Sequence, residues 1–290
     1  MGAHTDTLIT VAELADLIDA AEPVTILDVR WQLGRPDGRL AYGDGHLPGA
    51  VYVDLETELS DHSARGRGRH PLPSGSAVQA AARRWGVRAG VPIVLYDNWN
   101  RAGSARAWWV LRAAGIPDVR ILDGGLAAWV AAGRGLATGG EHPHDGDIEV
   151  PHENLYTGAL PTLTAAQAAA ITNSGVLIDA RAPERFRGES EPVDLAAGHI
   201  PGARNVPNGA LLDDRGFFRP AAELDAVFTA AGVRDAAAVG AYCGSGVTAA
   251  VDIAALRIIG IDAALFPGSW SEWSTDPTRP VATGPAEARA

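Results

Sequence analysis

The feature that most constrains the fold of this 290-residue chain is an internal repeat. The hexapeptide GHLPGA at residues 45–50 returns as GHIPGA at residues 198–203. A strand end of the form Asp-x-Arg precedes each copy, and a turn with a tryptophan follows each copy. These further landmarks lie at residues 27–30 and 178–181, and at residues 123–129 and 267–273. Three landmarks in the same order favour a duplicated domain.

The duplication predicts two domains joined by a linker. Residues 139–156 are rich in Gly, Pro, His and acidic residues and have no apolar periodicity, as is typical of a linker. We therefore expect one domain over residues 1–138 and a second over residues 157–290. Each is large enough to bury a core of its own, since domains usually hold about 100–200 residues.

Strand and helix patterns alternate in each copy, and the second copy is the clearer one. Its helical patterns cover residues 165–172, 221–231 and 247–259, and its short apolar strands cover residues 175–180, 237–242 and 264–266. Gly260 is placed to end the last helix. The alternation predicts an α/β fold in which each domain has a mainly parallel sheet with helices on both faces. Sites in such sheets form at the carboxyl ends of the strands.

Composition excludes several classes of function. The net charge is −11, and all 24 basic residues are Arg, which rules out lysine Schiff-base and P-loop chemistry. The acidic excess lies almost entirely in residues 141–290. No basic footprint of a nucleic-acid binder is present. One basic cluster, interpreted as a solvated loop, consists of Arg65, Arg67, Arg69 and His70.

Targeting signals are not seen in the sequence. The apolar runs are shorter than the roughly 18–20 residues that cross a membrane, so no membrane partner is expected. Residues 1–10 have neither a basic start nor an apolar core of the kind found in signal peptides. We therefore expect a cytoplasmic location.

Cys243 is the single cysteine, so an intramolecular disulfide and CxxC motifs are excluded. A lone cysteine is more often a small buried hydrophobe than a nucleophile. Here, however, it follows a strand and opens the glycine-rich segment CGSGVT, which leads into a helix. Backbone N–H groups of such a loop form an anion cradle, and a helix N-terminus next to a thiol favours the reactive thiolate. This position therefore favours a nucleophile.

The first copy of the repeat provides an internal control. Its strand ends Tyr96-Asp97, which aligns with Tyr242-Cys243. Thiol chemistry is therefore expected in the second domain alone, and the first is interpreted as a non-catalytic, supporting domain.

These motifs together resemble the tandem rhodanese family of sulfurtransferases, over nearly the whole chain. The segment CGSGVTA at residues 243–249 is similar to the CG[ST]GVTA loop of 3-mercaptopyruvate sulfurtransferases. Thiosulfate sulfurtransferases typically have CRKGVTA, with two basic residues where Gly244 and Ser245 stand here. The resemblance implies mercaptopyruvate as the sulfur donor and thiosulfate as the alternative.

The resemblance also implies roles for individual residues. Arg185 matches the arginine that binds the anionic end of the donor, and Ser245 matches a loop serine that assists proton transfer. His70 and Asp54 match residues that complete a Cys-Ser-His-Asp relay in mammalian members. The remaining loop residues expected to contact the substrate are Gly244, Gly246, Val247 and Thr248.

One position departs from the mammalian pattern. Mammalian mercaptopyruvate enzymes have a second substrate arginine in a Pro-Arg-Asp context, and Val193 stands at that place here. Arg187 could replace it only if its side chain turned inward, whereas a surface position is the simpler expectation.

The expected reaction is a double displacement. Cys243 takes a sulfane sulfur from a small anionic donor as a persulfide and passes it to cyanide, a thiol or thioredoxin, without a metal or organic cofactor. A Cys-based phosphatase is disfavoured, because Ala249 stands where that chemistry needs a phosphate-binding arginine. A non-catalytic rhodanese module that binds a partner protein is the alternative from another class.

Overall fold

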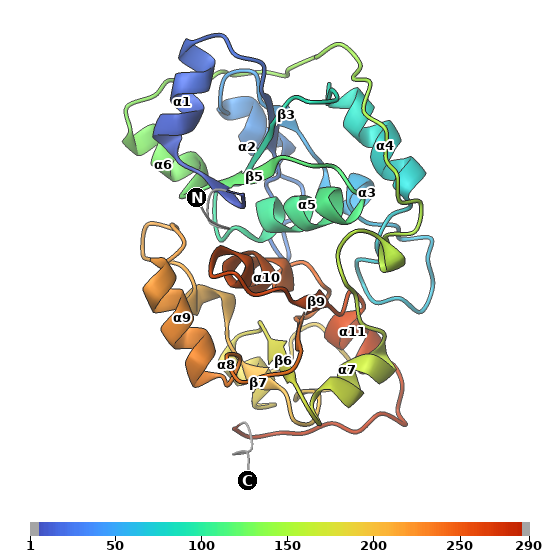
Figure 1. Ribbon diagram of the computed structural model, residues 1–290. Coiled ribbons are helices and arrows are strands. Elements are labelled where there is room, and N and C mark those ends of the chain that lie inside the picture. The colour runs from blue at the N-terminus through green and yellow to red at the C-terminus, as the bar shows by residue number, and fades with distance from the viewer. Residues whose placement is uncertain (1–5, 286–290) are drawn as a thin grey trace. The chain divides into compact units, whose positions relative to one another are not determined.

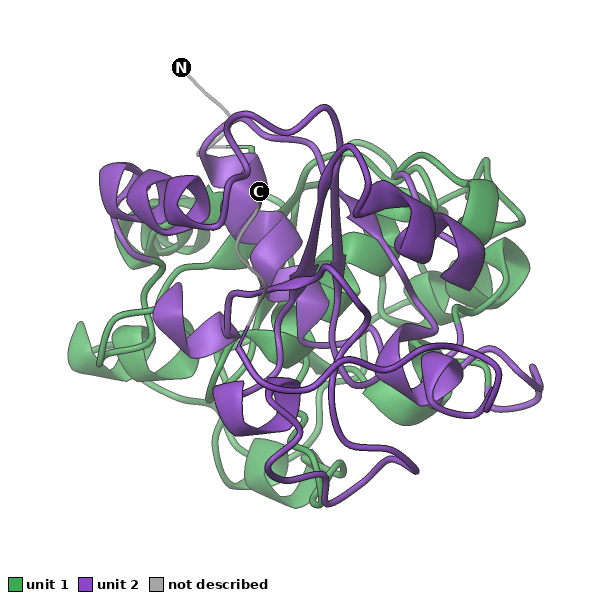
Figure 2. Cartoon of the chain, turned by 90° about the horizontal axis from the view of Figure 1, so that it is seen from below, with its two compact units in different colours: residues 1–61, 72–160, 212–218 green, residues 62–71, 161–211, 219–290 purple. Residues whose placement is uncertain are grey.

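A computed structural model of the chain describes residues 6–285 and divides it into two compact units (Figure 2). Unit 1 comprises residues up to 61 together with residues 72–160 and 212–218. Unit 2 comprises residues 62–71, 161–211 and those from 219 onward. Residues 62–71, which lie within the first repeat in the sequence, thus belong to the unit that contains Cys243. None of the helices within residues 6–285 has the length and apolar character needed to cross a membrane.

Unit 1 is built on five parallel strands in the order β1-β5-β4-β2-β3 (Figure 1). The strands are β1 (Leu8–Ile9), β2 (Thr25–Asp28), β3 (Val51–Tyr52), β4 (Ile93–Tyr96) and β5 (Val119–Leu122). The helices are α1 (Val11–Asp19), α2 (Arg39–Asp44), α3 (Leu55–Glu58), α4 (Gly75–Arg84), α5 (Ala102–Ala113), α6 (Gly125–Ala131) and the 3₁₀ helix η1 (Leu155–Thr157). This parallel α/β sheet is the predicted fold class.

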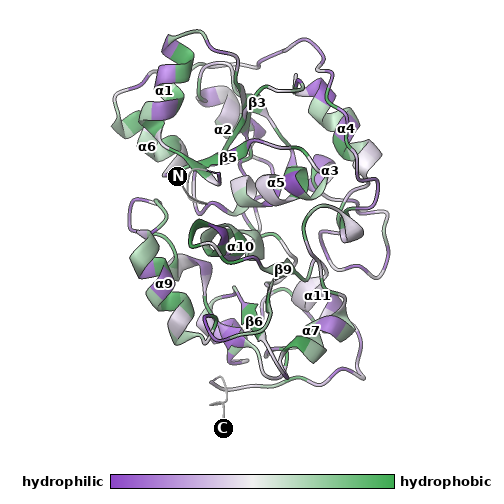
Figure 3. Cartoon of the chain, in the orientation of Figure 1, coloured by the Kyte–Doolittle hydropathy of each residue, from purple (hydrophilic) through white to green (hydrophobic). Residues whose placement is uncertain are grey.

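The two faces of the unit 1 sheet have separate helical cover. On one face, Leu14 of α1 and Trp129 of α6 pack in a core with Val94 and Tyr96 of β4. Neighbouring strand residues point to the opposite face, and α5 contacts β4 and β5. Hydrophobic and hydrophilic residues alternate along α1, as a helix with one buried side requires (Figure 3).

Unit 2 has four parallel strands in the order β7-β6-β8-β9. The strands are β6 (Val176–Asp179), β7 (Arg204–Asn205), β8 (Val239–Tyr242) and β9 (Ala264–Leu265). The helices are α7 (Ala165–Ile171), α8 (Pro183–Phe186), η2 (Asn208–Ala210), α9 (Ala221–Ala230), α10 (Ala249–Ile258) and α11 (Ser269–Trp273). The helices and strands expected in the second copy are confirmed to within about two residues at each end, the usual uncertainty of such boundaries.

Aromatic side chains dominate one core of unit 2. Trp270 and Trp273 of α11 pack there with Phe186 of α8, Tyr242 of β8 and Ala168 of α7. On α10, nine of the ten residues are buried, and this helix contacts β8, β9 and α9. Helices therefore enclose β8, the strand that leads to Cys243.

The repeated GH[LI]PGA and Asp-x-Arg motifs form one hydrogen-bonded device in each unit. In unit 2, buried Arg181 pairs with Asp179 at 2.6 Å and also donates to the carbonyl oxygen of Gly198 at 2.6 Å. The hydroxyl of Tyr242, at the end of the central strand, accepts the N–H of Ile200 at 3.1 Å. Burial alone would lower the pKa of Arg181, but the Asp179 carboxylate raises it above its usual value, so the guanidinium stays charged.

Unit 1 repeats this device almost atom for atom. Arg30 pairs with Asp28 at 2.8 Å and donates to the Gly45 oxygen at 2.5 Å, and Leu47 donates to the Tyr96 hydroxyl at 3.0 Å. The strongest signal of the sequence repeat is thus a structural motif that connects two strand ends to a loop.

Candidate active site

Cys243 directly follows β8 and is buried, with 2% of its surface exposed. Its backbone N–H donates to Ser269 Oγ at 3.1 Å, and its carbonyl oxygen accepts the N–H of Trp270 at 2.9 Å. The next carbonyl, of Gly244, accepts the N–H of Ser271 at 2.8 Å. The start of the loop is therefore fixed on the turn at residues 268–271, which lies within the repeated landmark at residues 267–273.

The loop after Cys243 is an array of unpaired backbone donors. Within residues 6–285, no hydrogen bond is donated by the N–H groups of Gly244, Ser245, Val247 and Thr248, although three of these residues are buried. Buried N–H groups are almost always paired, so such a cluster is suited to hold an anion.

Gly246 closes the loop around the sulfur. Its N–H donates to Cys243 Sγ at 3.2 Å. Its φ angle is +77°, and a Cβ atom there would collide with the carbonyl oxygen of Pro267. Only glycine satisfies both conditions without strain. The Gly246 N–H therefore contacts the sulfur atom directly.

The matching loop of unit 1 already holds an anion, the side chain of Asp97. One oxygen of this buried carboxylate accepts the N–H groups of Trp99 and Arg101 at 3.0 and 3.3 Å. The other accepts the N–H and hydroxyl of Ser104 at 3.1 and 2.7 Å. Asp97 also pairs with the Arg101 guanidinium at 3.1 Å. The strand–loop–helix segment of unit 1 thus binds the negative charge of Asp97. The corresponding loop of unit 2 follows Cys243.

Ser245 and His70 meet within unit 2. The Ser245 hydroxyl and His70 Nδ1 share a hydrogen bond of 2.7 Å, and both residues are buried. The two residues lie 175 positions apart in the sequence. A buried serine–histidine pair next to a candidate nucleophile can transfer a proton.

Asp54 has a structural task in unit 1. It is the N-cap of α3, where its Oδ1 accepts the N–H groups of Glu56 and Thr57 at 3.0 and 3.3 Å. It also pairs with Arg39 at 3.4 Å. These contacts explain Asp54 without a catalytic role, and its part in a relay stays a prediction.

Arg185, on α8, lies beside the loop and is held by two buried carboxylates. Its guanidinium contacts Glu191 at 2.5 and 3.1 Å and Asp194 at 3.2 Å. Burial alone would raise the pKa of Glu191, but hydrogen bonds from Arg185 and from the Asp194 N–H lower it below its usual value. Arg185 is thereby fixed with its Nη1 atom 3.7 Å from the place of a Cβ atom on Gly244.

A second arginine reaches the same place, and sequence reasoning missed it. Arg69 Nη2 lies 3.3 Å from the Cβ place of Gly244, and Arg69 Nη1 contacts Asp194 at 2.7 Å. The interpretation of this basic cluster as a solvated loop is therefore wrong for Arg69, whereas Arg65 and Arg67 are exposed. The one sequence signal that could have indicated Arg69 was its neighbour His70, which the family resemblance already placed in the relay.

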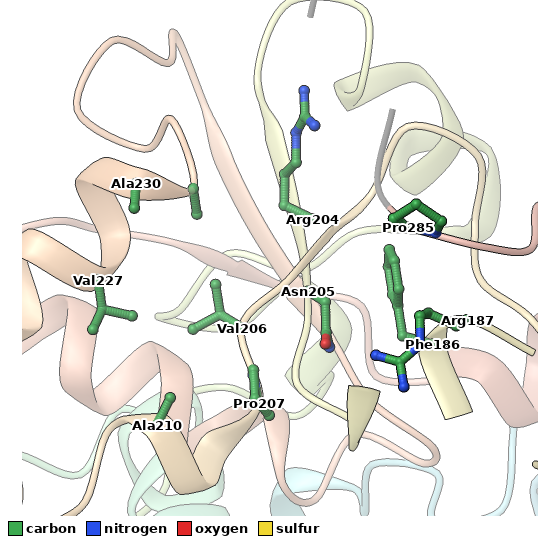
Figure 4. A pocket seen from close by; sticks show the side chains of 11 residues that line it. Phe186, Arg187, Arg204, Asn205, Val206, Pro207, Ala210, Val227, Ala230 and Pro285 are labelled. Atoms are coloured by element: carbon green, nitrogen blue, oxygen red, sulfur yellow. The ribbon is translucent and has the colours of Figure 1, made fainter. Parts of the chain in front are cut away.

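Arg187 does not replace the second arginine that Val193 lacks. It pairs with the exposed Glu189 at 2.6 Å and lines a cavity of about 470 Å³ between α8, β7 and α9. Figure 4 shows it on the same side of this cavity as Phe186 and Pro285. The lining residues do not include Cys243, so the reactive group is assigned from the loop geometry and not from this cavity. The part of the chain that the structure describes contains no cluster of His, Cys, Asp or Glu suited to a metal ion.

Comparison with known proteins agrees with the fold. A family profile described as "Rhodanese-like domain" matches residues 10–132 and again residues 164–276. The chain is 61% identical to the "Putative thiosulfate sulfurtransferase SseB" of Mycobacterium tuberculosis, over 99% of this chain and 100% of that protein. It is 43% identical to the "Probable 3-mercaptopyruvate sulfurtransferase" of Pseudomonas aeruginosa, over 96% and 98% of the two chains.

A solved structure extends the likeness to three dimensions. The crystal structure of SseA from Escherichia coli, which has the rhodanese fold, matches with a TM-score of 0.79 and 35% identity, covering 91% of this chain and 98% of that one. Two parallel α/β units, each matched by the family profile, define a tandem rhodanese protein. The chain therefore belongs to the rhodanese family, and it is a sulfurtransferase.

Proposed function

We propose that Cys243 carries a sulfur atom as a persulfide, from a small anionic donor to a thiophilic acceptor. The observation that carries this proposal is the cluster of unpaired backbone N–H groups in the loop that follows Cys243, where the Gly246 N–H donates to the sulfur atom. In unit 1 the same device surrounds the carboxylate of Asp97, a built-in anion. A persulfide anion on Cys243 would extend into an equivalent cradle and be stabilised there.

The donor step needs a proton when the donor is 3-mercaptopyruvate. The Cys243 thiolate attacks the donor sulfur, the S–C bond breaks, and the electron pair leaves on carbon as the enolate of pyruvate. This enolate then takes a proton at carbon. The Ser245 hydroxyl is suited to deliver it, because His70 can resupply the proton through their 2.7 Å hydrogen bond. The products are pyruvate and the Cys243 persulfide.

The acceptor step restores the enzyme. A thiolate or cyanide attacks the outer sulfur, and Cys243 leaves as a thiolate, so the reaction is a double displacement with ping-pong kinetics. Reduced thioredoxin is a suitable protein acceptor because it offers an accessible thiolate. We place the reaction in the cytoplasm, where a lone cysteine stays reduced.

We expect mercaptopyruvate to be the preferred donor. The loop offers a neutral Gly244-Ser245 pair with a proton route. The carboxylates of Glu191 and Asp194 offset the charges of the neighbouring arginines. Thiosulfate has two negative charges close to the transferred sulfur, whereas mercaptopyruvate has one charge further away. The relative from P. aeruginosa bears the corresponding name.

Thiosulfate is the second candidate donor, and a specific observation favours it. Arg69 and Arg185 together provide two cations next to Gly244, where the sequence predicted one. Thiosulfate would use them without any proton, since attack on its outer sulfur releases sulfite directly. The relative from M. tuberculosis is named for this donor.

A direct comparison of the two donors with cyanide as the acceptor tests this choice. We expect kcat/KM for 3-mercaptopyruvate to exceed that for thiosulfate by at least about tenfold, which corresponds to only ~1.4 kcal/mol of transition-state binding. Equal values, or a preference for thiosulfate, would mean that the arginine pair and not the neutral loop sets donor choice. Turnover with neither donor would favour a non-catalytic binding module.

Ser245→Ala separates the two chemistries further. Loss of a general acid typically costs 10²–10⁴-fold, so we expect a fall in kcat of about 100-fold or more with mercaptopyruvate. Thiosulfate turnover should change by less than about threefold, because sulfite leaves without protonation. Equal losses with both donors would show that Ser245 supports the loop and does not transfer a proton.

A further inference from the structure

The cavity of about 470 Å³ between α8, β7 and α9 has no part in the proposed function. Its volume falls in the range of roughly 300–1,000 Å³ that is usual for small-molecule sites. Most of the residues that line it are apolar: Phe186, Val206, Pro207, Ala210, Val227, Ala230, Ala231 and Pro285. The remaining lining residues are polar: Arg187, Arg204 and Asn205. An apolar lining with a few polar groups is the usual composition of a ligand site.

Hydrogen bonds fix the walls of this cavity. The Nδ2 atom of Asn205, on β7, donates to two carbonyl oxygens at and just after the end of β6, at 2.9 and 2.8 Å. Pro285 is held next to α8, because the N–H of the preceding Gly284 donates to the carbonyl oxygen of Arg187 at 2.9 Å. The cavity is therefore formed in advance, and a ligand would not have to order its walls.

The apolar side chains lie on two sides of the cavity. Figure 4 shows Val206, Val227 and Ala230 on one side, and Phe186 and Pro285 on the other. An aliphatic group between the two sides would contact carbon atoms on both and would be removed from water, which favours binding. The body of a ligand that fits this cavity is therefore aliphatic.

Arg187 and Arg204 give the cavity a positive charge. Among the described residues that line it, none is an Asp or Glu, although residues 141–290 carry almost all of the acidic excess of the chain. Arg187 donates to the exposed Glu189 through Nε at 2.6 Å and Nη2 at 2.8 Å. Within residues 6–285, its Nη1 atom makes no hydrogen bond. A guanidinium with an open N–H donor is suited to a carboxylate oxygen.

We propose that this cavity is a second ligand site of the protein, and that it binds a small monocarboxylate with an aliphatic body. The aliphatic body lies between the walls formed by α9 and α8, and the carboxylate contacts Arg187. The site is separate from the loop at Cys243. Arg185 is directed to Glu191, Asp194 and the loop, whereas Arg187, two positions further, lines the cavity. This inference goes beyond the proposed function, because it requires no sulfur transfer.

Isothermal titration calorimetry with octanoate and octanamide tests the proposal. The two probes have the same chain and nearly the same size, but only octanoate carries a charge. Both are titrated into the wild-type protein and into two variants, Ala230→Phe, which fills the cavity, and Arg187→Gln, which removes its charge. The matched controls are Ala226→Phe and Arg234→Gln. Ala226, on α9, and Arg234, just after that helix, are exposed and do not line the cavity.

We expect wild-type protein to bind octanoate with a Kd of about 1 mM or lower, a reasonable affinity for a ligand of about ten non-hydrogen atoms. Octanamide should bind about fivefold more weakly, because it lacks the charge that strengthens a hydrogen bond to Arg187. Arg187→Gln should weaken octanoate by a similar factor and leave octanamide unchanged. Ala230→Phe should weaken both probes by at least about tenfold, since the phenyl ring occupies the cavity. Both controls should bind as wild type does.

The same titration after alkylation of Cys243 with iodoacetamide separates the cavity from the loop. Octanoate affinity should stay within about twofold, as for two sites without shared contacts. Loss of octanoate binding in the alkylated protein would place the ligand at the loop and overturn the proposal.

Three further results would overturn it. They are no saturable binding of octanoate in the millimolar range, equal affinities for octanoate and octanamide, and wild-type affinity in Ala230→Phe. A thermal melt checks that Ala230→Phe is folded. If that variant does not fold, Arg187→Gln still decides, because Arg187 lies at the half-exposed rim. Equal octanoate affinity in Arg187→Gln and wild type would then contradict the proposed carboxylate contact.

Discussion

Gly244 has no side chain, and two guanidinium groups border the space that a Cβ atom would occupy. Arg69 Nη2 and Arg185 Nη1 lie 3.3 and 3.7 Å from the place of its Cβ atom. Its φ angle lies outside the left-handed region, so the backbone itself would accept alanine. We therefore expect glycine at this position to matter more for ligand binding than for folding.

Gly244→Ala should consequently raise KM for anionic donors by about tenfold, corresponding to about 1.4 kcal/mol. The added methyl group takes up space between the arginines and the loop. We expect the free energy of unfolding to change by less than about 1 kcal/mol. The melting temperature should then stay within about 2 °C of wild type, because 1 kcal/mol corresponds to about 2–4 °C in proteins of 150–250 residues. Steady-state kinetics and a thermal melt check both values.

Gly246→Ala is the matched control within the same loop. There a Cβ atom would collide with the Pro267 carbonyl, and φ is +77°. We expect a loss of stability of about 1–3 kcal/mol from the strained backbone, seen as a clearly lower melting temperature. If Gly244→Ala destabilised the protein as much as Gly246→Ala and left KM unchanged, the role given to the space at Gly244 would be wrong.

Among the elements, the strand–loop–helix unit β8–α10 positions the chemistry. Its existence could be predicted, because a short apolar strand, a glycine-rich turn and an apolar helix follow one another in the sequence. The helix begins at Ala249 and not at residue 247, since Val247 and Thr248 belong to the open loop. Sequence patterns mark the existence of elements better than their ends, where loop geometry competes with helix formation.

Asp252 is a buried carboxyl within α10 that the mechanism does not use. Both side-chain oxygens lack a hydrogen-bond partner among the described residues. Burial raises the pKa of this carboxyl well above its usual 3.8, and the Asp179 charge adds to the effect. The folded protein therefore holds a proton that the unfolded chain releases near pH 4.

The free energy of unfolding should fall as the pH rises above that value. The slope is up to about 1.4 kcal/mol per pH unit until the folded-state pKa is reached. Asp252→Asn removes this titration. The melting temperature of Asp252→Asn minus that of the wild-type protein should therefore increase as the pH is raised from 5 to 8. The exposed Asp235→Asn serves as the control and should track wild type. A constant difference between Asp252→Asn and wild type across this range would contradict a protonated Asp252.

At the scale of the whole molecule, the repeat allowed the two α/β units to be predicted, because its motifs are scaffold motifs. The hydrogen bonds of Arg30 and Arg181 depend on residues close by in the sequence, and such devices leave clear patterns. The site was only partly predictable. The contact of Arg69 with Asp194 spans 125 positions, and residues 62–71 belong to unit 2 although they lie within the first repeat. No local pattern records a contact of that kind.

Duplication also explains why a single cysteine suffices. In unit 1 the loop after the central strand binds the Asp97 carboxylate, whereas in unit 2 the matching loop begins with Cys243, and within residues 6–285 most of its N–H groups are unpaired. We therefore expect the first unit to take no part in thiol chemistry. The chain is expected to hold one sulfur atom and no more.

Mass spectrometry of the intact protein tests this claim most directly. The wild-type protein is incubated with 3-mercaptopyruvate or thiosulfate in the absence of an acceptor, and Cys243→Ser is treated in the same way. We expect the wild-type mass to increase by one sulfur atom, to return to its original value when cyanide is added, and to stay constant throughout in Cys243→Ser. A Cys243→Ser protein that still transferred sulfur at the wild-type rate would contradict the account, because no other cysteine exists to take over.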